Sequence, residues 1–356
     1  MTKQKHNTTA ILHTTKDTTK KITTGHKITS WTQYSYALEQ RGNFTVLLNK
    51  AVLDATPEQS GKAGHPVQYS DAVILFLAQL REFMQLPLRQ TIGMARFIFW
   101  QAGLELALPS YATLSRRMGV LKVPSYLSFS QSFSRAPFLS LLDHSAPPII
   151  FLPDSTGLKL SGEGEWKVKK HGVEPGKRRQ WLKVHLGTDY ASRQIVAYRT
   201  SSSNEHDNQS LMPLLDALPS ELALRLGQVI GDGAYDSETL YRAVEGRGAT
   251  LLVPPPKNAK WHGDIKHGQL VDEPGWEQRN AYVRGCMRLG RKEWKRQSGY
   301  HRRSLAETSM FRLKRAFGSS LKSRKRANQD TEVAIRVSLL NLFTGYGLPT
   351  YQTAVT

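Results

Sequence analysis

The sequence predicts an α/β protein in which a mixed sheet follows a helical N-terminal domain. Three observations support this fold class. Apolar residues three and four positions apart, the spacing of an amphipathic helix, dominate residues 30–122. From residue 149 onward, short apolar runs typical of buried strands alternate with helical segments. The 356-residue chain is also long enough for two domains and a sizeable core.

The chain is strongly basic, with 49 Lys and Arg residues against 29 Asp and Glu residues and a formal net charge of +20. Residues 284–326 alone contain 15 basic and two acidic residues, so this segment carries +13. Such an excess indicates a polyanionic partner, nucleic acid before a membrane surface. A ribosomal protein would share this charge, which therefore identifies only a class of partner.

The cysteine count and hydropathy exclude several other classes. Cys286 is the sole cysteine, so an internal disulfide and a cysteine-built zinc site are excluded. No apolar run approaches the length of about 18 residues that a membrane-spanning helix needs. The N-terminus has no apolar signal-peptide core. We therefore expect a reducing, cytoplasmic compartment.

The N-terminal third divides into a tail and a helical domain. Residues 1–29 are rich in Thr and Lys and poor in large apolar residues, so we expect a disordered tail, or translated sequence upstream of the working start codon. Residues 30–122 are predicted to be helical. Ser70 is the expected N-cap of one helix, and a second helix starts at Pro87 and ends near Gly103.

A short helix is expected over residues 111–118, closed by Gly119. It carries Arg116 and Arg117 and follows a turn, which is the outline of a helix-turn-helix DNA reader. A small helical bundle with a solvated pair of arginines would show the same pattern. Residues 123–148, rich in Ser and Pro, are predicted to be a linker.

The elements after the linker occur in a characteristic order. Strands are expected at residues 149–152, 181–187 and 195–198, then a helix at 207–218, a strand at 228–230, a helix capped by Ser237 and a strand at 251–253. Residues 257–298 form a modest polar insertion, and residues 331–343 form a helix that covers a face of the sheet. This is the order of the ribonuclease H-like fold. The predicted catalytic domain spans residues 149–347, and residues 348–356 are a tail.

Two aspartates follow predicted strands. Asp154 and Asp232 each come just after a short apolar run, where α/β sheets place their ligands. A ribonuclease H-like sheet sets its first and fourth strands side by side, so these two carboxylates would meet. Taken singly, each aspartate is more often an ordinary turn residue. The neighbouring Asp236 is interpreted as a turn or cap residue.

Residues 299–318 contain Tyr300, Arg303, Glu307 and Lys314, separated by two, three and six residues. If a helix begins near Tyr300, these side chains share one face. The alternative is that Ser304 and Glu307 form a capping box, which makes Glu307 structural. With Asp154 and Asp232, Glu307 would complete three oxygen ligands for Mg²⁺ or Mn²⁺.

A basic loop precedes the predicted hairpin, and we expect it to contact phosphates rather than to be merely solvated. Its cationic residues include Lys169, Lys170, Arg178 and Arg179. Three histidines in this part of the chain are too scattered to predict a metal site.

These motifs together resemble those of the insertion-sequence DDE transposases. The spacing of the tyrosine, arginine, glutamate and lysine is similar to the signature of that family. The stretch FLPDSTGLKL resembles the block around its first aspartate, and GDGAYDS resembles the block around its second. The stretch YSDAVILFLAQLREFMQLPLRQTIGM with PSYATLSRRM resembles insertion-sequence family five in particular, and the resemblance covers about residues 64–347.

The resemblance implies a DNA-cutting and joining enzyme on a ribonuclease H-like fold. It maps the catalytic and metal-binding triad to Asp154, Asp232 and Glu307, and phosphate contacts to Tyr300, Arg303 and Lys314. The implied cofactor is Mg²⁺ or Mn²⁺. The implied partners are terminal inverted repeats, target DNA and a second copy of the chain on the DNA, at the bacterial nucleoid.

Two other functions remain open at this point. A nuclease of the same fold could cut DNA without joining it, and an inactive derivative could act as a DNA-binding repressor. The intact set of three acids favours an active enzyme.

Overall fold

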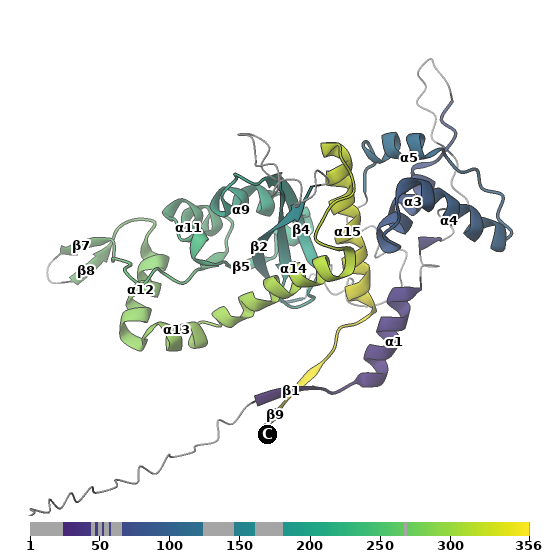
Figure 1. The fold of residues 1–356 in the computed structure, drawn as a ribbon. Helices are drawn as coiled ribbons and strands as arrows, with labels where there is room; N and C mark the ends of the chain where they lie inside the picture. The colour runs from purple at the N-terminus through teal and green to yellow at the C-terminus, as the bar shows by residue number, and fades with distance from the viewer. Residues whose placement is uncertain are drawn as a thin grey trace, which may run out of the picture.

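The computed structural model describes residues 24–43, 47–48, 52, 57, 66–123, 146–160, 181–266 and 269–355. A central sheet lies between two helical regions, with the N-terminal helices on one side and α12, α13 and the β7–β8 hairpin on the other (Figure 1). No helix in these described ranges is long and apolar enough to cross a membrane.

The N-terminal helices begin and end close to the predicted positions. Ser70 caps its helix by accepting a hydrogen bond from the backbone N–H of Val73 at 3.3 Å, and Ser110 does the same for Thr113 at 3.1 Å. Both caps satisfy donors that the first helical turn leaves free. The helices are α1 (Trp31–Gly42), α3 (Asp71–Phe83), α4 (Leu88–Gln101) and α5 (Tyr111–Met118).

The central sheet has five strands in the order β4-β3-β2-β5-β6. Within this sheet β3 is antiparallel to both of its neighbours, β2 and β4, whereas β2, β5 and β6 are parallel to one another. The prediction that the first and fourth strands are neighbours is therefore confirmed. The strands are β2 (Ile149–Lys159), β3 (Trp181–Asp189), β4 (Ile195–Ser202), β5 (Leu226–Ile230) and β6 (Thr250–Leu252).

Side chains on the two faces of β2 pack into different cores. Phe151 joins the buried cluster built with Leu211, Leu214 and Tyr241 from the helices on one face. Leu158 joins a second buried cluster on the opposite face. The first face is covered by α9 (Asp207–Asp216), α10 (Ser220–Ala223) and α11 (Glu238–Glu245), and the second by α14 (Ser304–Phe317) and α15 (Arg326–Tyr346).

The polar segment predicted as a modest insertion has a regular structure. It contains an antiparallel hairpin followed by two helices. Trp294 buries its ring in a third cluster beneath the sheet, together with Leu152 and Ile230, so these helices extend the core rather than project from it. The elements are β7 (Gly263–Lys266), β8 (Gln269–Asp272), α12 (Glu277–Leu289) and α13 (Arg291–Gln297).

The N-terminal helices share one buried apolar cluster with the central sheet. Phe76 and Leu80 of α3 belong to the same cluster as Leu158 of β2 and Val337 of α15. The closing helix α15 is central to this arrangement, because it packs against α1, α3, α5, α14 and β4. The residues predicted as two successive domains are therefore joined by a continuous core.

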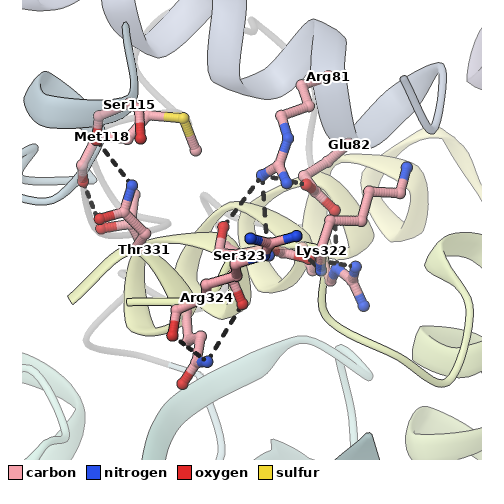
Figure 2. Close-up of polar contacts among 12 residues, drawn as sticks. Arg81, Glu82, Ser115, Met118, Lys322, Ser323, Arg324 and Thr331 are labelled. Carbon is pink, nitrogen blue, oxygen red and sulfur yellow. Dashed lines mark hydrogen bonds and ion pairs between the residues drawn. The ribbon is translucent and has the colours of Figure 1, made fainter. Parts of the chain in front are cut away.

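A buried ionic network reinforces the contact between α3 and α15. Figure 2 shows Arg81 and Glu82 of α3 facing the C-terminal elements. The Arg336 guanidinium donates to Glu82 at 2.8 Å and to Glu332 at 2.6 Å, and all three side chains are almost fully buried. Burial and the nearby charge of Glu332 raise the pKa of Glu82. Because these charges are removed from water, each is compensated only by its ion-pair partners, and removing one partner would destabilise the fold.

Two predicted tails are in part structured, which corrects the sequence interpretation. β1 (Thr24–Ile28) pairs antiparallel with β9 (Tyr351–Val355), and the Thr29 N–H donates to the Thr350 carbonyl at 3.0 Å. A ladder of backbone hydrogen bonds needs no apolar side chains, so the composition argument missed it. Residues 1–23 lie outside the described ranges.

Candidate active site

The parallel pairing of β2 and β5 places the two aspartates at the same level of the sheet. Phe151 is paired with Val229, and Asp154 and Asp232 each lie three residues further along their chains. The two aspartates differ in their backbone conformation, because Asp154 lies within a strand and Asp232 lies beyond the end of one. β2 does not end before Asp154, as the sequence predicted, but continues through it, with Asp154 opposite Leu186 of β3.

Local hydrogen bonds orient both carboxylates. The Asp154 carboxylate accepts a hydrogen bond from the Ser155 N–H at 3.0 Å. Asp232 lies two residues after the end of β5 and caps the short 3₁₀ helix η2 (Gly233–Tyr235) by accepting from the Ala234 N–H at 2.9 Å. Because only one oxygen of each carboxylate is used in this way, further acceptor capacity remains.

Glu307 reaches the same region from the first turn of α14. The helix does not begin with the predicted capping box. A 3₁₀ turn, η3 (Tyr300–Arg303), runs directly into α14, and the Ser304 hydroxyl donates to the His301 carbonyl at 2.9 Å. Ser304 therefore does not cap the helix through its side chain, and Glu307 is directed elsewhere.

Arg303 brings the three acids together. Its guanidinium donates to the Glu307 carboxylate at 2.5 Å and lies 3.7 Å from Asp154 and 3.5 Å from Asp232. The arginine side chain is only 16% exposed, so water screens these charges weakly. The three predicted acids thus converge on one cation. The sequence predicted that Arg303 shares a helix face with Glu307, but it did not predict that the guanidinium also faces Asp154 and Asp232.

Burial dominates the electrostatics of this site. It raises the pKa of Asp154, and the charge of Arg303 opposes that shift. Burial on its own would lower the pKa of Arg303, but the hydrogen bond with Glu307 and the charge of Asp154 outweigh it, and the pKa is raised. Arg303 therefore stays charged among the carboxylates.

The donor chemistry of the site fits a hard divalent cation. Three carboxylates, which are the ligands preferred by Mg²⁺ and Mn²⁺, face the same positively charged group. Within the described part of the chain, no three His, Cys, Asp or Glu side chains are close enough together to hold one ion as they stand. Arg303 and a metal ion would compete for the same carboxylate oxygens.

The other members of the signature flank this group of acids. Tyr300 is half-buried, burial raises the pKa of its phenol, and the Lys295 ammonium lies 4.9 Å from the centre of its ring. Lys314 follows Glu307 by seven residues on α14, which places it two turns away on the same side of the helix. The signature residues thus follow η3 and one side of α14, with Lys314 furthest from the acids.

The remaining predicted residues have different surroundings. Asp236 forms a buried ion pair with Arg279 at 2.9 Å and accepts from the Tyr241 hydroxyl at 3.2 Å. Arg117 donates to Asp71 at 2.5 Å and to the Tyr69 carbonyl at 3.0 Å.

Arg116, by contrast, lies exposed on α5, where its guanidinium donates to the Thr113 hydroxyl at 3.4 Å. The four basic-loop residues fall outside the described ranges: Lys169, Lys170, Arg178 and Arg179.

A polar cluster behind Asp154 was missed by sequence reasoning. The Asp207 carboxylate, at the start of α9, accepts from the Ser155 hydroxyl at 2.6 Å and pairs with Lys183 at 2.8 Å. Beside them His185 is buried, and its imidazole lies 2.8 Å from the Ser201 hydroxyl. The available signal was that polar residues alternate with Leu182, Val184 and Leu186 along a strand with both faces covered.

Burial and the charge of Lys183 lower the pKa of His185 to about 4. The imidazole is therefore neutral at neutral pH. The cluster ties the residue next to Asp154 to the helix that covers the opposite face of the sheet.

Two family descriptions match the chain. A transposase DDE domain matches residues 145–342, and a second transposase DDE domain description matches residues 39–163. Enzymes of this family generally use divalent metal ions. The first match spans more than half of the chain and includes Asp154, Asp232 and Glu307. The chain therefore belongs to the DDE transposases and is a DNA transposase.

Proposed function

We propose that this transposase is a member of insertion-sequence family five that binds the terminal inverted repeats of its element, cuts at the ends and joins them to target DNA. Asp154, Asp232 and Glu307 are the proposed catalytic residues and metal ligands. The observation that carries this assignment is their convergence on Arg303 from two neighbouring strands and one helix.

The proposed reaction consists of two phosphoryl transfers. Water first displaces the 3′-oxygen at the end of the element, and the released 3′-hydroxyl then displaces a phosphodiester oxygen in the target. Mg²⁺ or Mn²⁺ held by the three carboxylates would stabilise the negative charge that develops on the attacking and leaving oxygens. Both steps are in-line displacements at phosphorus, so one site serves them without a covalent protein–DNA intermediate.

Arg303 has a central part in this proposal. A guanidinium binds phosphate oxygens through paired hydrogen bonds as well as it binds carboxylates. When a phosphodiester enters, Arg303 can exchange its carboxylate contacts for phosphate contacts, and Tyr300 and Lys314 extend the phosphate-binding surface on either side. The chain thus positions the reacting phosphate with the same residue that neutralises the acids.

DNA recognition is assigned to the helical region of residues 30–122. Exposed Arg116 on α5 is the proposed base contact, because a short helix after a turn can enter the major groove. Arg117 is retained in the proposed binding surface, although its contact with Asp71 also supports the helix. We propose that two copies act together on DNA, because an element has two ends to be cut.

Conservative substitutions of the acids test the catalytic assignment. Asp154→Asn, Asp232→Asn and Glu307→Gln are expected to abolish metal-dependent cleavage of terminal-repeat DNA while binding is largely kept. Asp236→Asn is the control, because this acid pairs with Arg279 rather than with Arg303. It should lower the melting temperature and leave cleavage by the folded protein intact. An active Asp232→Asn enzyme would contradict the assignment.

A joining assay separates the two other functions that the sequence left open. Pre-cut ends with a free 3′-hydroxyl are supplied together with a plasmid target. A transposase joins them, a nuclease of the same fold cuts but does not join, and an inactive repressor binds without doing either.

A further inference from the structure

Two arginines from different helices meet at the C-terminal end of α15. The Arg41 guanidinium of α1 donates to the Gly347 carbonyl at 2.5 Å, and the Arg312 guanidinium of α14 donates to the Thr344 hydroxyl at 2.8 Å. Gly347 and Thr344 belong to the same closing turn, because the Gly347 N–H donates to the Thr344 carbonyl at 3.1 Å. Both α1 and α14 pack against α15 (Figure 1). The last turn of α15 therefore holds both guanidiniums at one place.

A third arginine, Arg193, reaches this place from the turn between β3 and β4. Asn341 of α15 fixes the start of β4 by hydrogen bonds of 2.8 Å to both the N–H and the carbonyl of Ile195. Arg193 precedes Ile195 by two residues, and its charge acts on Arg312. Three elements thus dock on the last two turns of α15, and each brings a partly exposed arginine. We call these residues the arginine cluster: Arg41, Arg193 and Arg312.

The charge of the arginine cluster is not balanced by an acid. Burial and the charges of Arg41 and Arg193 lower the pKa of Arg312 to about 10, and the opposing group is the phenol of Tyr34 rather than a carboxylate. The Nε–H of Arg41 is buried and has no hydrogen-bond partner among the described residues. The end of α15 supplies a partial negative charge of about half an elementary unit. Most of the positive charge of the cluster is therefore uncompensated.

The backbone at Arg193 is a separate sign that its side chain has a role. Its φ is +58°, in the left-handed region that glycine and asparagine adopt more readily than arginine. Backbone conformations of this kind cost stability and are concentrated at ligand sites. An arginine at a position suited to glycine indicates that the guanidinium, rather than the turn, is what the position requires.

The ligand that fits several guanidiniums around one point is a phosphate group, whose oxygens accept paired hydrogen bonds. The chain is a DNA transposase, so the polyanion that it must hold is DNA. Arg312 follows Glu307 by five residues, which turns it about 140° around α14, whereas Lys314 lies on the same side as Glu307. The arginine cluster and the acids therefore face different sides of this helix.

We propose that the arginine cluster binds one phosphate of the DNA backbone, at a site separate from the acids. This site attaches DNA without regard to sequence, alongside α1 and the end of α15. The proposal does not depend on which residues perform catalysis, because none of the three arginines contacts Asp154, Asp232 or Glu307 in the described structure.

The test measures binding of a scrambled duplex across a salt series without divalent metal, so that neither cleavage nor recognition of the repeat contributes. The double variant Arg193→Asn/Arg312→Gln is expected to lower the slope of log affinity against log salt by about one unit, the loss of one phosphate contact. An unchanged slope overturns the proposal. A loss of about two units also overturns it, because the arginines would then hold separate phosphates.

Arg247→Gln/Arg326→Gln is the matched control, because it removes the same charge from two arginines that are already paired with carboxylates, Asp216 and Asp330. It should keep the wild-type slope, and a loss equal to that of the first double variant would show a mere effect of net charge and overturn the proposal. An active Asp232→Asn enzyme would contradict the catalytic assignment and leave these slopes unchanged.

The melting temperature separates a binding role from a structural one. Arg193→Asn should melt at the wild-type temperature or above it in the absence of DNA, since asparagine suits the left-handed backbone and one repelling charge is gone. A clearly lower melting temperature would make the Arg193 guanidinium a structural group and overturn its place in the site.

Discussion

Arg303 donates a hydrogen bond of 2.5 Å to Glu307, one helical turn away, and the same guanidinium faces Asp154 and Asp232. Three carboxylates close together repel one another, and their repulsion is strongest where water is scarce. Arg303 offsets this repulsion from within the helix that supplies the third acid. The positive charge that makes the acidic site stable is therefore part of the same short segment as Glu307.

The first prediction concerns competition between Arg303 and metal ions. Removing the guanidinium in Arg303→Ala leaves the three carboxylates without their counter-charge, so a divalent ion should stabilise this variant more than the wild type. The melting temperature of each protein, measured with and without Mn²⁺ and in the absence of DNA, checks this. Arg302→Ala, which removes the neighbouring arginine that lies over Tyr190, is the control. Equal metal-induced shifts in Arg303→Ala and wild type would contradict it.

The second prediction concerns the ionic network between α3 and α15. Arg336→Met should lower the free energy of unfolding by about 3–5 kcal/mol, because it removes the cation nearest to the buried carboxylates of Glu82 and Glu332 and leaves Arg81 to pair with both. Arg326→Met is the control, since its ion pair with Asp330 is about half exposed and such pairs contribute about 1 kcal/mol at most. Urea unfolding measures both. Similar stabilities of the two variants would show that the network contributes little.

The third prediction concerns pH. The His185 pKa is about 4 in the folded protein against 6.5 as its ordinary value, so the unfolded chain binds the proton more tightly. The contribution of His185 to the free energy of unfolding is fully present above pH 6.5 and decreases by roughly 3 kcal/mol as the pH falls toward 4. The control variant His185→Gln keeps a hydrogen-bonding group and cannot titrate. The stability difference between wild type and this variant, from urea unfolding, should shrink over this pH range; a constant difference would refute the prediction.

The fourth prediction separates base contacts from phosphate contacts. Arg116→Ala should lose about 1–3 kcal/mol of preference for terminal-repeat over scrambled DNA. Lys314→Ala should weaken binding to both DNAs alike and reduce the salt dependence by about one unit. Affinities across a salt series measure both effects. If Lys314→Ala alone changed the preference for the repeat, the assignment of recognition to the N-terminal helices would be wrong.

The sequence predicted those features that depend on local pattern and strand order. Ser70, the hairpin and the neighbouring strands of Asp154 and Asp232 were recognised because caps, alternation and fold order leave clear signals. The pairing of β1 with β9 was not predicted, since Thr29 and Thr350 are 321 positions apart and no local pattern connects them. The approach of Arg303 to Glu307 was predicted, but its position beside Asp154 and Asp232 was missed, because it depends on the 3₁₀ turn that precedes α14.

The central place of α15 has a consequence for protein synthesis. A nascent chain that has emerged from the ribosome only as far as α14 lacks the helix that covers α3 and β4. Arg81 and Glu82 then have neither Arg336 nor Glu332 to pair with, and the apolar face of α3 stays in water. The core therefore closes only after α15 has left the exit tunnel, and a truncated translation product cannot complete the fold.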